Sequence, residues 1–103
     1  MARSYSYKFL LGLKDADPTR LGVKLGRLCV DANLPATYVA RALNISRMTI
    51  YAWFRGQGIR EEKRKVVEAF MTIVETDMEA RRLPAASMID AKLYIEEMVG
   101  GQI

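Results

Sequence analysis

The sequence contains no histidine, a single cysteine and no glycine-rich phosphate-binding motif, and each absence removes a class of function. Without histidine, the commonest general base and metal ligand is missing. The motifs G-x-S-x-G, G-x-x-x-x-G-K-[ST] and G-x-G-x-x-G are absent as well, so we expect neither an enzyme nor a cofactor. Cys29 alone cannot form an internal disulfide or a metal cluster, and we expect it to be a buried helix residue.

Long apolar runs are also missing from the chain. No window approaches the roughly 18 apolar residues that a membrane-spanning helix needs, so we expect no membrane segment. The opening stretch MARSYSYKFLLGLKDADP has a short apolar centre but no small-residue cleavage site, which argues against a secretion signal. Half of the 103 residues are hydrophobic, which is enough for one domain with a packed core. We therefore expect a cytoplasmic protein.

Charge is distributed unequally along the chain, whose formal net charge is +4. Residues 1–65 contain 13 lysines and arginines against 5 acidic residues, whereas residues 66–103 contain 3 against 7. A basic half is typical of a protein that approaches a polyanion, and an acidic half is repelled by one. The asymmetry favours nucleic acid as the partner of the first 65 residues.

Apolar residues at helical spacing predict an all-α fold, a small bundle of about five helices. The first predicted helix begins at Pro18, is capped by Asp17 and ends near Asn33. The other four are predicted over 35–43, 46–55, 59–82 and from 87 onward, separated by Asn44, the stretch GQG at 56–58 and the stretch LPAAS at 83–87.

These patterns divide the chain into three parts. Residues 1–17 would form a short N-terminal strand or an arm, because apolar and aromatic residues alternate there as they do in strands. Residues 18–82 would form the main domain. Residues 83–103 would form a C-terminal helix that either pairs two copies of the chain or folds back to complete a monomer's core. Its apolar residues repeat like a coiled-coil seam: Met88, Ala91, Ile95, Met98 and Val99.

The segment LPATYVARALNISRMTIYAWFRG at residues 34–56 indicates two short helices joined by a tight turn. Ile50 and Trp53 are expected to fill the wedge between the helices, and Phe54 to pack on the helix over 59–82. The rest of the second short helix must then face outward. This outward set combines apolar and cationic side chains, which suits a DNA groove better than open solvent: Arg47, Met48, Tyr51, Ala52 and Arg55.

The major groove of B-DNA is about 12 Å wide and accepts one α-helix, with the helix N-terminus nearest the bases. Arg47, in the first turn, could bind guanine O6 and N7 together. Met48 and Ala52 could contact thymine methyl groups, while Ser46 and Thr49 could hold a phosphate at the helix start. These residue types at this spacing predict double-stranded DNA as the partner.

The same segment resembles the helix-turn-helix of phage repressor and Cro proteins, the lambda-repressor-like family. The resemblance rests on Leu34, Val39-Ala40, Leu43, Ile45-Ser46, Thr49-Ile50 and Arg55-Gly56. It implies that the bases are read by Arg47, Met48, Tyr51 and Ala52. It implies that the DNA backbone is contacted by Thr37, Ser46, Thr49 and Arg55. A basic cluster follows, which would either contact further phosphates or form a solvated helix start: Arg60, Lys63, Arg64 and Lys65.

Three functions are compatible with these features. The first is a sequence-specific transcriptional regulator that binds double-stranded DNA as a homodimer in a bacterial or phage-infected cell. The second is a DNA-packaging recognition subunit that resembles phage small terminases. The third is a protein that inhibits a host protein through the exposed face of the helix over 46–55. We expect the first, with no metal, no cofactor and no small-molecule ligand.

Overall fold

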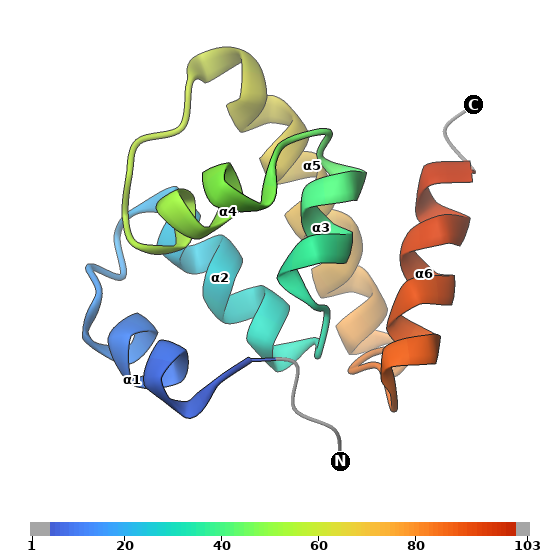
Figure 1. Ribbon diagram of the computed structural model, residues 1–103. Coiled ribbons are helices and arrows are strands. Elements are labelled where there is room, and N and C mark those ends of the chain that lie inside the picture. Colours follow the sequence, from blue (N-terminus) through green and yellow to red (C-terminus); the bar gives the residue numbers. More distant parts are fainter. Residues whose placement is uncertain (1–4, 101–103) are drawn as a thin grey trace.

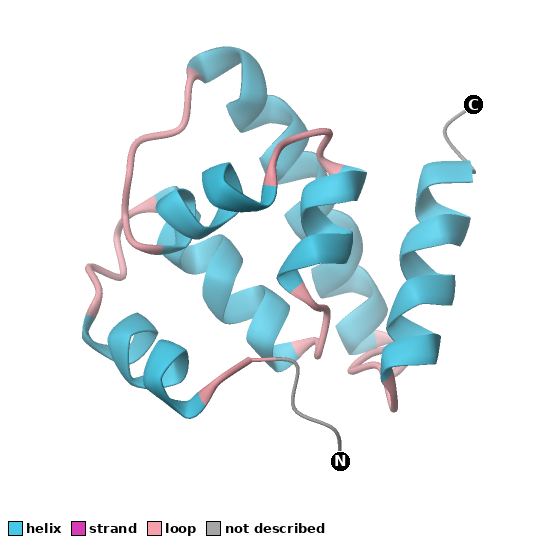
Figure 2. Cartoon of the chain, in the orientation of Figure 1, coloured by secondary structure: helices cyan, strands magenta, loops and turns pink. Residues whose placement is uncertain are grey.

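Six helices make up most of the protein in the computed structural model, which describes residues 5–100 (Figure 1). They are α1 (Tyr7–Asp15), α2 (Leu21–Asp31), α3 (Ala36–Ala42), α4 (Arg47–Phe54), α5 (Glu61–Glu79) and α6 (Met88–Gly100). Between residues 5 and 100 the chain contains no strand, so the predicted all-α class is confirmed (Figure 2). None of the helices in this part of the chain is both long and apolar enough to cross a membrane.

The N-terminal part of the chain is helical, which corrects the prediction of a strand or an arm and adds a sixth helix. α1 begins after Ser6, whose hydroxyl accepts a hydrogen bond from the N–H of Phe9 at 3.1 Å. Phe9 and Leu13, one helical turn apart, face the core, whereas Tyr7 is 68% exposed. A capped start and a helical period therefore outweigh the local alternation of apolar residues. The predicted arm also included residues 1–4, which lie outside the described residues.

α2 begins three residues later than the sequence predicts, because Asp17 does not cap it. The Asp17 carboxylate instead accepts hydrogen bonds from the N–H of Thr19 at 2.9 Å and from its hydroxyl at 2.7 Å, and closes a local turn. These two hydrogen bonds lower the pKa of Asp17. Arg20 takes the N-cap position of α2 without a side-chain hydrogen bond to the helix start, so Pro18 belongs to the turn.

α2 runs through the core of the fold, with Val23, Leu25 and Cys29 almost completely buried. α4 meets it at Gly22, where an added Cβ atom would overlap the carbonyl oxygen of Trp53. Only glycine allows the two backbones to approach this closely. Burial raises the pKa of the Cys29 thiol, which therefore stays protonated. The expectation that Cys29 is a buried helix residue is confirmed.

The inner face of α4 is occupied as predicted by Ile50 and Trp53, both of which are buried. Phe54 is buried as well, but its ring faces α1 and α2, with its centroid 5.8 Å from that of Phe9 and 6.5 Å from that of Tyr5. The prediction that Phe54 packs on α5 is therefore corrected. The reason is that α1, which the sequence did not predict, lies against that side of α4.

α6 folds back onto α3 and completes the core of a single chain (Figure 1). Ala91 and Ile95 are buried, and Met98 and Val99 pack against the same core. The apolar seam predicted for pairing two copies is therefore largely occupied within the monomer. This outcome corresponds to the second of the two alternatives for the C-terminal helix.

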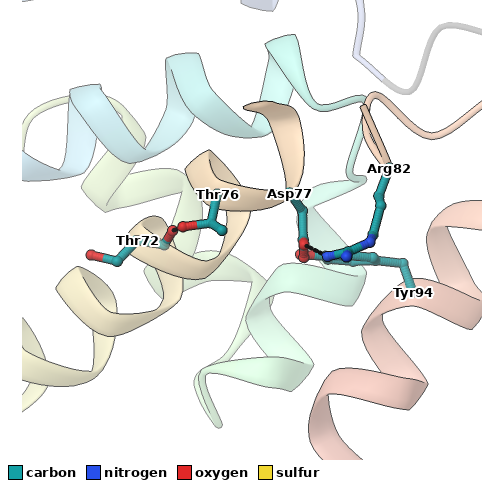
Figure 3. A network of polar contacts seen from close by, with 5 residues as sticks. All are labelled: Thr72, Thr76, Asp77, Arg82 and Tyr94. Carbon is teal, nitrogen blue, oxygen red and sulfur yellow. Dashed lines mark hydrogen bonds and ion pairs between the residues drawn. The ribbon is translucent and has the colours of Figure 1, made fainter. Parts of the chain in front are cut away.

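Polar contacts fix the connection between α5 and α6 (Figure 3). Asp77 of α5 forms an ion pair with Arg82 at 2.7 Å and accepts a hydrogen bond from the hydroxyl of Tyr94 on α6 at 2.6 Å. The amide of the buried Asn33 donates to the carbonyl of Ala85 at 2.7 Å. These contacts tie the α5–α6 connection both to the end of α5 and to the turn that follows α2.

Candidate nucleic-acid interface

The connection between α3 and α4 is held in one geometry by backbone and side-chain hydrogen bonds. Asn44 adopts a positive φ of 56°, which asparagine tolerates better than most residues. The N–H of Ile45 donates to the carbonyl of Ala40 at 3.0 Å and closes the turn. Ser46 then caps α4, because its hydroxyl accepts a hydrogen bond from the N–H of Thr49 at 3.0 Å. The predicted tight turn at Asn44 and the predicted start of the helix at Ser46 are both confirmed.

The start of α4 presents two large side chains to solvent. Arg47 and Met48 are both exposed, Met48 to 80%. Arg55, at the C-cap of the helix, is exposed as well. Because α4 is capped at its start and buried on its opposite face, this exposed edge has a fixed position relative to the core. It combines two guanidinium groups with one thioether.

Tyr51 and Ala52 are half-buried, which departs from the prediction that they face outward with Arg47. The Tyr51 ring meets the rings of Phe9 and Phe54 edge-on, with centroids 5.5 Å and 5.8 Å away. For Tyr51 the cause is again α1, whose Phe9 packs against this flank of α4. Tyr51 and Ala52 therefore offer less surface to a partner than the sequence indicates.

Tyr51 also supports the exposed arginine of the preceding turn. The guanidinium carbon of Arg47 lies 5.7 Å from the centroid of the Tyr51 ring, within the range of a cation–π interaction. Residues four apart on a helix are neighbours on its surface, so this contact follows from the register of α4. The ion pairs within residues 5–100 do not include Arg47. Its N–H groups are therefore available to a partner while its position is restrained by Tyr51.

The other predicted contact residues surround α4. Ser46 and Thr49 lie at its start, where the Ser46 hydroxyl also donates to Thr49 Oγ1 at 2.9 Å. Thr37 is exposed in the first turn of α3. Arg60 is exposed at the N-cap of α5, which follows the loop after α4. Their hydroxyl and guanidinium groups are the donors that proteins commonly direct at phosphate.

Lys63, which the sequence predicts as a phosphate contact, also forms a hydrogen bond within the fold. Its ammonium group donates to the carbonyl of Leu43 at 3.3 Å. Leu43 is the C-cap of α3, so Lys63 satisfies a carbonyl that the helix leaves free and places a positive charge at the helix C-terminus. The neighbouring Arg64 and Lys65 remain exposed.

Arg20 belongs to the same surface, although no spacing in the sequence indicates it. Its Nε donates to the carbonyl of Gly56 at 2.9 Å, which ties the start of α2 to the loop after α4. Arg20 and Arg64 line a polar hollow of about 220 Å³ together with Gln57 and Gly58 of that loop. Arg20 and Gly56 are 36 residues apart, so no local pattern predicts the hydrogen bond between them. The sequence offers only a weak indication of the role of Arg20, which is its position in the stretch that precedes a helix.

The chain matches no protein-family model, no curated protein and no solved structure. Within residues 5–100, no group of three or more cysteine and acidic side chains is arranged to hold a metal ion. Exposed guanidinium groups, hydroxyls at two helix starts and one thioether form a set that suits phosphates and the edges of bases.

Proposed function

We propose that the protein is a sequence-specific regulator that binds double-stranded DNA, in which α3 and α4 form a helix-turn-helix and α4 enters the major groove. The observation that carries this proposal is the capped N-terminus of α4, from which Arg47 and Met48 project into solvent. The resemblance of residues 34–56 to phage repressor and Cro proteins supports the same orientation. The protein would act as a homodimer, because one such motif reads only a few base pairs and two copies bind half-sites one helical turn apart.

Base reading in this proposal depends chiefly on the two exposed residues of the first turn. The planar fork of Arg47 can donate to O6 and N7 of one guanine, which is the commonest specific contact in the major groove. Met48 can pack on a thymine methyl group. Tyr51 acts mainly by restraining Arg47, since a side chain that is already positioned loses less conformational entropy when it binds. Ala52 contributes a small surface beside them.

Phosphate binding in this proposal comes from three directions around α4. The free N–H groups of its first turn favour an anion, and the hydroxyls of Ser46 and Thr49 lie beside them. Arg55 and Arg60 approach from the loop side of the helix. Arg20 joins them because its hydrogen bond to Gly56 occupies Nε and leaves its terminal N–H groups for a phosphate.

The distribution of charge supports the same orientation. The first 65 residues, which contain α1 to α4, carry 13 basic and 5 acidic residues. The remaining residues, which contain most of α5 and all of α6, carry 3 basic and 7 acidic residues. A polyanion would attract the first part and repel the second, so the molecule would approach DNA with α4 leading.

Arg47→Ala tests the reading surface. The substitution should weaken binding to a preferred duplex by about 1–3 kcal/mol and relax the choice of base at one position, because the bidentate contact to guanine is lost. The fold should be unaffected, since the side chain is exposed. Fluorescence anisotropy with the preferred duplex and its single-base variants, at about 0.15 M salt, measures both effects.

Two matched variants control this experiment. Arg47→Lys keeps the positive charge but not the planar fork, so it should retain non-specific binding and lose most of the base discrimination. Lys92→Ala removes a positive charge from an exposed position on α6 and should bind like the parent protein. An Arg47→Ala protein with unchanged base preference would remove Arg47 from the reading surface.

A further inference from the structure

α1 lies beside α4, and both helices are nearer to the viewer than most of α2 in Figure 1. The ring centroid of Phe9 on α1 is 5.5 Å from that of Tyr51 and 5.8 Å from that of Phe54, both on α4. The side chain of Leu13 lies against Gly26 of α2. α1 and α4 therefore pack on α2 and on each other. The sides of α1 and α4 that are turned away from α2 must then face in the same general direction.

The helical register of α1 identifies the side that is turned away from α2. Successive residues of an α-helix are about 100° apart around its axis. In one sense of rotation from Phe9, Leu13 follows at about 40° and Leu10 at about 100°. Both leucines line a hollow between α1 and α2, so this side of α1 faces α2. In the opposite sense, Gly12 follows Phe9 at about 60° and Lys8 at about 100°. Gly12 and Lys8 therefore lie next to the contact with α4 and away from α2.

The exposed edge of α4 lies on the same side of the molecule. The backbone of Trp53 meets Gly22, so Trp53 marks the side of α4 that faces α2. Arg47 and Met48 are about 120° and 140° from Trp53 around the helix, and both are exposed. Lys8 of α1 and the exposed edge of α4 therefore border one surface, with the ring contacts of Phe9 between them.

The chemistry of this side of α1 suits a polyanion that passes close to the helix. Lys8 is exposed, and within residues 5–100 its ammonium group takes part in no ion pair or hydrogen bond. A Cβ atom at Gly12 would meet no other atom within 4 Å, so packing within the chain does not require glycine there. A helix without a side chain at this point allows another backbone to approach closely. The acidic residue on this side, Asp15, lies seven residues after Lys8, about 10 Å farther along the axis.

The dimensions of the major groove indicate what this surface would meet. An α-helix with its side chains is about 10–12 Å across, and the groove is about 12 Å wide. α4 would therefore fill the groove, and a helix beside it would lie over the sugar–phosphate strand at the groove's edge. Such a helix has no access to base edges, so it contributes affinity without base preference.

We propose that α1 is a second part of the DNA-binding surface, in which Lys8 binds a phosphate of the strand at the edge of the groove and the strand passes over Gly12. This inference rests on the proposed function and deepens it. It assigns a DNA contact to a helix outside the helix-turn-helix segment, residues 34–56.

Removal of one charge from either side of α1 tests the phosphate contact. Lys8→Gln should weaken binding to the preferred duplex about fivefold at about 0.15 M salt and lower the slope of log affinity against log salt by about 1. The loss should be the same for every sequence. Lys14→Gln is the matched control, because Lys14 is exposed on the same helix about 120° from Lys8, at the hollow beside α2. It should leave the slope unchanged. Circular dichroism checks that both variants keep the helical fold.

Replacement of single phosphates by uncharged methylphosphonates shows whether Lys8 acts by direct contact. At one linkage, the replacement should weaken binding of the parent protein about fivefold and have no further effect on Lys8→Gln, as expected for two groups that interact. At the other linkages, the losses from the DNA change and from Lys8→Gln should add.

A second pair of variants tests the close approach at Gly12. Gly12→Glu adds bulk and a negative charge on the side of Lys8 and should weaken binding about tenfold. Tyr7→Glu places the same carboxylate about 140° away around the helix, at a residue that is 68% exposed, and should weaken binding less than about twofold.

The outcomes separate this inference from the proposed function. An unchanged salt slope for Lys8→Gln, an equal loss from Lys14→Gln, or the absence of a coupled linkage would overturn the α1 contact. If Arg47→Ala still relaxed the choice of base, recognition by α4 would stand without α1. A parent protein with no affinity for duplex DNA would overturn the proposed function and the α1 contact together.

Discussion

Trp53→Ala should lower the free energy of unfolding by about 3–5 kcal/mol, which is the usual cost of removing a large aromatic side chain from a core. Trp53 is only 6% exposed and lies on the face of α4 that packs against α2. A domain of this size has roughly 5–15 kcal/mol of stability in total, so the variant should be close to unfolding at 37 °C. Urea denaturation followed by circular dichroism measures the loss.

Met48→Ala is the matched control on the same helix. Met48 is 80% exposed, so its removal should change stability by less than about 0.5 kcal/mol. The comparison also tests which face of α4 is buried. If Trp53→Ala kept the parent's unfolding midpoint and lost only its affinity for DNA, Trp53 would belong to the binding face and the assignment of the two faces would be wrong.

Gly22→Ala should cost about 3 kcal/mol, at the upper end of the usual cost of overpacking. A Cβ atom at this position would overlap the carbonyl oxygen of Trp53 and lie 2.6 Å from its carbonyl carbon. Both are backbone atoms, so α2 and α4 would have to move apart. The displacement would tilt the exposed edge of α4, and affinity for DNA should fall even under conditions where the variant is folded. Thermal unfolding and anisotropy titration measure the two losses.

Gly12→Ala controls for the substitution itself. Gly12 lies within α1, and a Cβ atom there would meet no other atom within 4 Å. Alanine is favoured over glycine in a helix by about 0.8–1.0 kcal/mol, so this variant should be slightly more stable than the parent. Opposite signs for the two glycine variants would support the close contact between α2 and α4. A neutral Gly22→Ala variant would contradict it.

The parts of the fold that the sequence predicts well are those determined by local chemistry. Asn44 accepts a positive φ, Ser46 caps α4, and the hydroxyl of Ser87 accepts a hydrogen bond at the start of α6. Each effect depends on residues within three or four positions of one another. The burial of Ile50 and Trp53 could be predicted for a similar reason, because helical periodicity separates the two faces of a short helix.

The parts that could not be predicted depend on contacts between distant residues. Phe9 shares its surroundings with Tyr51 and Phe54, and nothing near α1 in the sequence indicates that α4 will lie beside it. The same holds for the hydrogen bond from Lys63 to the carbonyl of Leu43. In the candidate interface, the exposure of Arg47 follows from the register of α4. The partial burial of Tyr51 depends on α1. The sequence did not predict this helix, because apolar and aromatic residues alternate in the N-terminal stretch as they do in a strand.

The proposal that α4 reads double-stranded DNA is tested most directly by selecting bound fragments from a pool of random duplexes at about 0.15 M salt. We expect enrichment of a palindromic sequence whose half-sites are about 10 base pairs apart, centre to centre, with a guanine in each half-site whose selection is lost with Arg47→Ala. A pool that remains random after repeated rounds, with the folded and dimeric protein, would contradict sequence-specific recognition of DNA by α4.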